Sequence, residues 1–263
     1  VLAAGATGHE GHEHRAPGEA IDPEHAYPYG LIAAGGGHFH ALLVTPDLRT
    51  LFAGTHIGLF RSQDRGVTWR LVASRFSGDD VHAVAVDGKT GVLYAATHGQ
   101  GLLASPDQGA HWYDESDALP GRYLQALALE AMTGGVYVWA VGHGVLYRAT
   151  GTRRWERRAG PDVLAGVESL AVNPGPRRLY AGTASGVWVS DDGGRRWRLP
   201  EGGLRARTAG VGVSAHHPDR VFAATFDGVF VGRADGTAWT ALGPAPDWWG
   251  PLDGFAFVGA RFH

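Results

Sequence analysis

One eight-residue pattern occurs three times in this chain, as Ser62-Gln-Asp64-Arg-Gly66-Val-Thr68-Trp69, Ser105-Pro-Asp107-Gln-Gly109-Ala-His111-Trp112 and Ser190-Asp-Asp192-Gly-Gly194-Arg-Arg-Trp197. Degenerate copies end at Trp155 and Trp239. In such a pattern the Asp accepts hydrogen bonds from backbone N–H groups of a tight turn, and the Gly supplies a positive φ. The pattern therefore predicts a recurring turn, with structural rather than catalytic roles for Asp64, Asp107, Asp192, Trp69, Trp112 and Trp197.

Short runs typical of β-strands repeat around each copy. The first set is His40–Val44, Leu51–Thr55, Gly58–Ser62 and Val67–Leu71, and the second begins at Val81. Equivalent positions at the start of successive sets are His40, His82, Gln125, Glu168 and Ala209, which are 42, 43, 43 and 41 residues apart. This spacing is the length of a four-stranded propeller blade, so the chain is predicted to be an all-β propeller.

Five complete blades fit this spacing, and they cover about 38–75, 80–117, 123–160, 166–203 and 208–243. A last strand-like segment, 254–262, is interpreted as a closing strand within a propeller domain of residues 38–263. The alternative is six blades, of which the last is incomplete. Residues 1–37 lie outside the repeat and are rich in Gly, Ala, Pro, Glu and His. They are predicted to form a flexible, His-rich leader.

The repeated pattern resembles the Asp-box, also called the BNR repeat, of β-propeller proteins. The resemblance covers about residues 38–243 and implies a propeller fold. Sialidases share these turns, but their Phe/Tyr-Arg-Ile-Pro motif is absent from this chain. The enzymes of this type that act on xyloglucan use two larger propellers, and a chain of this length is too short for them. Photosystem-assembly propellers, which act as binding scaffolds, are similar in repeat type.

Composition excludes several classes of function. The 263 residues contain no Cys, so disulfides, thiolate metal sites and cysteine nucleophiles are excluded. The formal net charge is −3 and there is no basic stripe, so nucleic acid is not expected as a partner. No apolar run is long enough to predict a membrane span. Residues 1–6 resemble the end of a signal peptide, so we expect an exported protein that is periplasmic or extracellular, with membrane anchoring before processing as a further option.

Histidines occupy two recurring positions of the repeat. His38, His40 and His82 stand where first strands begin, and His56 and His98 directly follow second strands. His143 lies one residue off the second position in the third blade. In a propeller the first strand of each blade lines the central channel, and these two positions open on the same face of the ring. Six of the 14 His therefore map to one rim of one channel, on blades one to three.

This asymmetry favours a site over a structural role, because a structural residue would recur in every blade. Imidazoles bind copper and zinc well, so the sequence predicts a transition-metal site at the channel mouth. An all-nitrogen ligand set favours copper over zinc, and no organic cofactor is expected. Other polar residues continue the ring as candidate channel ligands: Gln125, Glu168 and Asp253. The same rim could instead hold a small acidic ligand on protonated histidines.

Two other functions remain open from sequence alone. Glu168 and Asp253 could act as the acid–base pair of a glycoside hydrolase, and Asp79 or Asp80 could replace either of them. The chain could also be a protein-interaction scaffold without chemistry, in which case a protein partner is expected. No catalytic residue is assigned.

Overall fold

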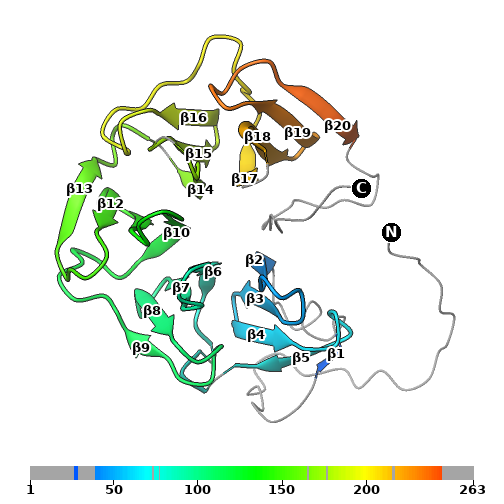
Figure 1. Cartoon of the computed structure of the whole chain (residues 1–263), viewed down its shortest axis with the longest axis vertical. Helices are drawn as coiled ribbons and strands as arrows, with labels where there is room; N and C mark the ends of the chain where they lie inside the picture. The colour runs from blue at the N-terminus through cyan, green and yellow to red at the C-terminus, as the bar shows by residue number, and fades with distance from the viewer. Residues whose placement is uncertain are drawn as a thin grey trace, which may run out of the picture.

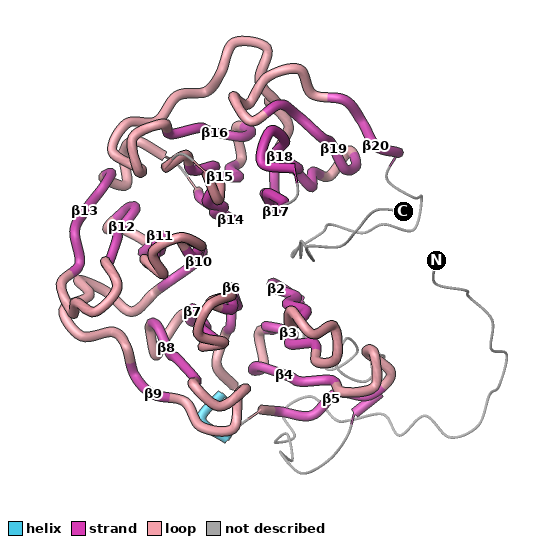
Figure 2. The backbone as a smooth tube through the Cα atoms, viewed as in Figure 1, coloured by secondary structure: helices cyan, strands magenta, loops and turns pink. Residues whose placement is uncertain are grey.

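The described part of the chain forms a ring of antiparallel β-sheets around one axis (Figure 1). The computed structural model describes residues 27–28, 39–72, 74–76, 78–164, 166–175, 177–214 and 217–244. Over these residues the strands alternate with loops, and the one helical element is a short 3-10 turn, η1 (Ser74–Phe76) (Figure 2). No helix in this part of the chain is long and apolar enough to cross a membrane.

Five sheets follow one another in chain order, which confirms the prediction of a five-bladed all-β propeller. The strands of blades one and two are β2 (Phe39–Val44), β3 (Leu51–Thr55), β4 (Gly58–Ser62), β5 (Thr68–Leu71), β6 (Val81–Val86), β7 (Leu93–Thr97), β8 (Leu102–Ser105) and β9 (Tyr113–Asp114). Those of blades three and four are β10 (Leu124–Leu129), β11 (Val136–Ala140), β12 (Gly144–Arg148), β13 (Trp155–Ala159), β14 (Val167–Val172), β15 (Leu179–Thr183) and β16 (Gly186–Ser190). Blade five consists of β17 (Thr208–Ser214), β18 (His217–Thr225), β19 (Gly228–Arg233) and β20 (Thr240–Pro244). The first strand of every blade lies nearest the axis (Figure 1).

Two blades depart from the four-stranded pattern. Blade one gains a fifth strand, β1 (Tyr27–Pro28), which pairs with β5 although its residues belong to the predicted leader. Blade four has three named strands, and the single bridge Val189–Arg198 stands in place of the fourth. Pro200 follows closely and cannot donate a backbone hydrogen bond, which limits pairing there. The rest of the predicted leader and the predicted closing strand 254–262 lie outside the described residues.

The turn between the third and fourth strands has the same hydrogen bonds in each well-matched copy of the motif. In blade two, Ser105 Oγ and the His111 backbone N–H both donate to Asp107 Oδ1, each at 2.8 Å. Gly109 adopts a φ of +90°, and its carbonyl accepts from Trp112 Nε1 at 3.1 Å. The same set of bonds occurs around Asp64 and Asp192. Because third strands run away from the end where first strands begin, these turns lie at the opposite end of the ring.

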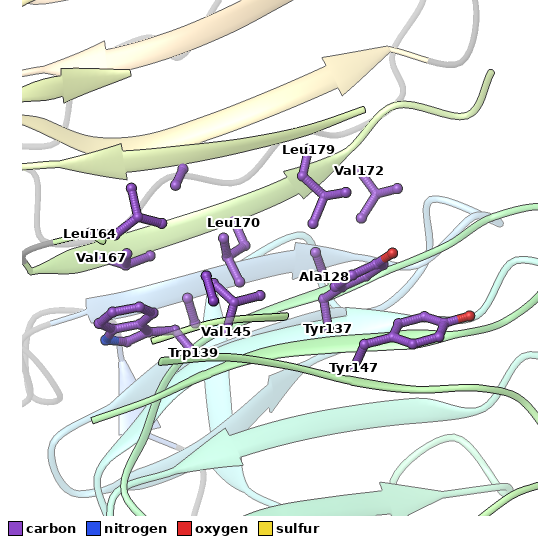
Figure 3. Packing of buried hydrophobic residues seen from close by; sticks show 13 residues of the cluster. Ala128, Tyr137, Trp139, Val145, Tyr147, Leu164, Val167, Leu170, Val172 and Leu179 are labelled. Carbon is purple, nitrogen blue, oxygen red and sulfur yellow. The ribbon is translucent and has the colours of Figure 1, made fainter. Parts of the chain in front are cut away.

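Neighbouring blades are held together by apolar side chains between their sheets. Between blades three and four, Trp139 and Val145 from one sheet lie against Val167, Leu170 and Leu179 from the next (Figure 3). All five are buried. Each fully buried side chain of this kind contributes about 1.5–3 kcal/mol through removal from water. The core is therefore distributed between blades, and the first strands are fixed around the axis.

Candidate functional site

Each first strand carries a β-bulge at the same position. In blade one, Phe39 pairs with Thr55 and Ala41 pairs with Gly54, so His40 between them has no partner across the ladder. His82 occupies the same position in blade two. The bulged residues of blades three to five are Gln125, Glu168 and Ala209. A bulge redirects the side chain of its extra residue. All five bulged residues line one cavity of about 200 Å³ at the axis.

The turn after each second strand provides a second set of positions. Thr55 Oγ1 donates to the Gly58 carbonyl at 2.8 Å and accepts from the Ile57 backbone N–H at 3.2 Å. This turn presents His56. The Thr97 hydroxyl makes comparable bonds in blade two, where the turn presents His98.

A third set of positions stands two residues before the bulge, where blade two carries Asp80. The Asp80 carbonyl accepts from the backbone N–H of His98 at 2.9 Å, and the backbone N–H of Asp80 donates to Asp79 Oδ1 at 3.1 Å. Asp79 is fixed in turn by Gln100, whose Nε2 donates to Asp79 Oδ2 at 2.8 Å. The loop that carries Asp80 is thus tied to the turn that carries His98.

These three sets of positions bring four imidazoles around one carboxylate. We call His40, His56, Asp80, His82 and His98 the His/Asp cluster. His56 Nδ1, His82 Nε2 and His98 Nδ1 lie 3.0, 3.1 and 3.2 Å from Asp80 Oδ2, and His40 Nε2 lies 3.2 Å from Oδ1. One ligand atom from each of His40, His56, Asp80 and His82 can be chosen so that all four lie within 4.8 Å of one another.

The cluster is ordered by ring stacking and opens on one side. The rings of His40, His82, His98 and Tyr123 stack in that order, with centroid separations of 4.1, 3.5 and 3.7 Å. The side chains of His40, His82 and His98 are only 10–12% exposed, whereas His56 is 43% exposed. Solvent therefore reaches the cluster past His56.

The charges favour the form of the cluster that binds a cation. Burial raises the pKa of Asp80, but its close contacts with His40, His82 and His98 outweigh burial and hold that pKa well below its usual range. Burial is the main cause that lowers the pKa of His82, so its imidazole is neutral at pH 7. An ionised carboxylate beside a neutral imidazole is ready for a metal ion without first losing a proton.

Three buried atoms of the cluster lack a hydrogen bond. They are Asp80 Oδ1, His82 Nε2 and His98 Nε2, and no partner of acceptable geometry lies among the residues that the structure describes. Buried polar atoms are normally paired, so atoms left without partners in one place indicate a missing ligand. Two of the three belong to the set that can converge on one metal ion.

The other residues predicted from the sequence lie around the cluster or outside the described part. His143 is half-buried against Gly121 and is not one of the residues that converge. Gln125 Nε2 donates to Glu168 Oε2 at 3.1 Å on the far wall of the same cavity. His38 and Asp253 lie outside the described residues.

The sequence predicts Asp80 only as a possible carboxylate for sugar hydrolysis and not as a ligand of the metal site. Its position was nonetheless visible, because Asp80 precedes His82 by two residues as His38 precedes His40. The donor set therefore contains an oxygen, and the all-nitrogen argument that favoured copper does not apply to it.

No family model and no curated protein matches the chain. Among solved structures, the chain is similar to the GH74 xyloglucanase of Xanthomonas campestris, with 20% identity over 76% of this chain and 37% of that one, and a TM-score of 0.57. The GH74 enzyme of Niastella koreensis is similar at 19% identity over 76% and 38% of the two chains, with a TM-score of 0.56. A chain of a nidogen/laminin complex is similar at 11% identity over 77% and 78%, with a TM-score of 0.62.

These similarities support the propeller fold and nothing finer. The chain spans well under half the length of either GH74 enzyme. Glycoside hydrolases are among its structural neighbours, but so is a protein crystallised as a protein–protein complex. The function must therefore be argued from the site.

Proposed function

We propose that this propeller binds a divalent transition metal at the mouth of its channel, through His40, His56, Asp80 and His82. The observation that carries the proposal is the approach of four imidazole nitrogens to within 3.0–3.2 Å of one carboxylate. Metal–ligand bonds of about 2.0–2.2 Å place neighbouring ligand atoms roughly 2.9–3.5 Å apart. The distances from the histidine nitrogens to Asp80 fall in this range, and one ligand atom from each of the four residues lies within 4.8 Å of the others.

Hydrogen bonding alone accounts poorly for the cluster. His40 Nε2 and His56 Nδ1 face each other at 3.0 Å, so one of the two must carry a proton toward the other. Protonating several of these imidazoles would place positive charges side by side in a half-buried site, which a single carboxylate offsets only in part. One metal ion would satisfy all of these atoms together.

The donor chemistry limits the metal. Three imidazole nitrogens and one carboxylate oxygen suit zinc and copper, and they are too rich in nitrogen for calcium or magnesium. We propose zinc or copper without preference between them. His40 and His82 lie on strands, and the loop that carries Asp80 is fixed by hydrogen bonds, so these ligands are held more precisely than ligands on a free loop.

Metal content of protein purified without an affinity tag or chelator tests this proposal. We expect stoichiometric zinc or copper in the full chain and in a version beginning at Ala33, which lacks the histidines of residues 1–32. His82→Ala should weaken binding by on the order of 100-fold, because it removes one ligand. His143→Ala is the matched control, since it removes a histidine of the same rim outside the cluster. Loss of metal on truncation alone, or equal losses in the two variants, would contradict the proposal.

The two alternative functions predict different results in the same experiment. A glycoside hydrolase would cleave xyloglucan or another glucan and lose this activity in Glu168→Gln. A scaffold would bind no metal and would tolerate all of these substitutions. Membership of the Asp-box family and export also stay proposals: the three matched turns support the first, and the composition of residues 1–6 suggests the second.

A further inference from the structure

We infer that the proposed metal binds a small hydroxy- or aminocarboxylate, whose carboxylate is held by Arg207 across the channel mouth. This inference rests on the proposed function and adds the class of ligand. It starts from the cavity of about 200 Å³, which has His40 and His82 on one wall and Glu168, Arg207 and Phe226 on the other. A molecule in this cavity would touch two metal ligands and a guanidinium at once.

Arg207 is placed for this role by the architecture of the ring. It precedes the bulged Ala209 by two residues, which is the position that Asp80 holds relative to His82. Its guanidinium lies over the Phe226 ring at 4.8 Å, and Phe226 occupies the turn position that carries His56 in blade one. Two of the three kinds of position that contribute to the His/Asp cluster thus place a guanidinium and an aromatic ring in blade five.

Among the described residues, the guanidinium of Arg207 has no hydrogen-bond acceptor. Its closest anionic partner is Glu168, with Nη2 and Oε1 3.8 Å apart, which is too long for a hydrogen bond. Within the described ranges Arg207 donates no hydrogen bond, although a guanidinium carries five N–H donors in a fork that matches a carboxylate. Its side chain is 59% exposed, so an entering anion can reach it.

Glu168 narrows the choice of ligand. It is held by Gln125 at one oxygen and faces Arg207 with the other. A simple anion would be repelled by the carboxylate of Glu168 and would have no donor group to hydrogen-bond to it. A carboxylate that carries a neighbouring hydroxyl or amino group can donate to Glu168 while its carboxylate pairs with Arg207. The same pair of groups is a good chelator for a metal held by imidazoles.

Calorimetric titration with L-lactate, before and after loading with zinc, tests the inference. We expect lactate to bind the zinc-loaded chain and to bind the metal-free chain much more weakly. Propionate, which lacks the hydroxyl, should bind the loaded chain more weakly than lactate. Arg207→Met should weaken lactate binding by about tenfold or more, because it removes a charge-assisted, forked contact. Zinc binding should be unchanged in that variant.

Arg205→Met is the matched control, since Arg205 lies two residues away and does not line the cavity. Phe226→Leu keeps the guanidinium and removes its stacking partner, and a smaller loss of lactate binding is expected there even if Arg207→Met folds poorly. Equal lactate affinity in the two arginine variants, or no lactate binding by the zinc-loaded chain, would overturn the inference. Failure of the chain to bind zinc would instead overturn the proposed function.

Discussion

At one end of the ring, Asp64, Asp107 and Asp192 lie in turns with nearly the same hydrogen bonds, whereas at the channel mouth the described side chains vary: blades one and two share histidines, and blades three to five differ from them and from one another. The bulge position alone holds His in blades one and two, Gln, Glu and Ala in the others. Both ends are built by the same strands. The difference indicates that the repeated end maintains the fold, while the varied end is free to bind.

Substituting Asp80 gives the largest effect that this comparison predicts. Asp80→Ala should weaken zinc binding by on the order of 100-fold or more, because it removes the one carboxylate that all four imidazoles approach. The metal-free protein should stay folded, since the backbone bonds of Asp80 remain, but its temperature of unfolding should fall somewhat, because the contacts with His40, His82 and His98 that hold the pKa of Asp80 low are lost. Competition with a chelator measures the first quantity and circular dichroism the second. Unchanged metal affinity in Asp80→Ala would contradict the assignment of metal binding to the channel mouth.

The two ends of the ring should respond to acid at different pH values. Burial lowers the pKa of His82 below its usual value, so its imidazole is neutral at pH 7, and protons should displace zinc from the cluster as the pH falls below about 6.5. Hydrogen bonds from Thr68 and Ser62 lower the pKa of Asp64 to about 2, and bonds from His111 do the same for Asp107.

The contribution of Asp64 and Asp107 to stability depends on pH because their pKa values differ between the folded and unfolded protein. Because their pKa is lower in the folded protein, their stabilisation is present above about pH 4 and is lost as the pH falls toward 2. His82 titrates below its unfolded value as well, so the metal-free protein also loses some stability as the pH falls below about 6.5. We expect zinc to be released while circular dichroism still reports a folded chain. Loss of zinc and fold in one transition would contradict this order.

Substituting an aspartate at the repeated end should have the opposite consequence to Asp80→Ala. Asp192 accepts from Ser190 Oγ and from the backbone N–H groups of Arg195 and Arg196. Asp192→Ala should lower the free energy of unfolding by about 1–2 kcal/mol, since the turn is partly solvated and water replaces some of these bonds. Zinc affinity should stay within twofold of the original. Denaturant titration and calorimetry measure the two quantities, and a large loss of zinc affinity would contradict the separation.

Within the His/Asp cluster, the smallest effect on zinc affinity is expected at His98, to which we assign a positioning role. His98→Phe preserves a ring between His82 and Tyr123 but removes the nitrogen 3.2 Å from Asp80. Zinc affinity should fall by about tenfold, as is typical when a group that orients a ligand is lost. Tyr123→Phe keeps the stack and should have no measurable effect. A loss as large as that in Asp80→Ala would make His98 a ligand instead.

The fold was predictable because the repeat supplies the same information five times. A spacing of 41–43 residues and the Asp-type turns identified blade number, strand order and the equivalence of His40 with His82 and Glu168. The short fourth strand of blade four and the addition of β1 were not predictable, because each depends on one local pairing. Pro200 and the two residues Tyr27–Pro28 have no counterparts in the other blades.

The site was predictable only in part. The repeat placed His40, His56, His82 and His98 on one rim, and the structure brings all four to one carboxylate. The repeat aligned Asp80 with His38, but it did not reveal the direction in which the side chains of the adjacent residues Asp79 and Asp80 point. Asp79 turns back to Gln100 and Asp80 turns to the histidines. His143 is predicted on the same rim, but Val141 and Gly142 separate it from the end of its second strand, and it lies against Gly121.

The bulge has a consequence for how such a protein can change. A bulged residue is exempt from cross-strand pairing, so the sheet places few demands on its identity, and His, Gln, Glu and Ala all occur there in one molecule. The five bulged positions line one cavity at the axis. We expect that the residue at each of these positions can be exchanged without disturbing the ladders beside it, so the lining of the channel mouth can change while the architecture stays the same.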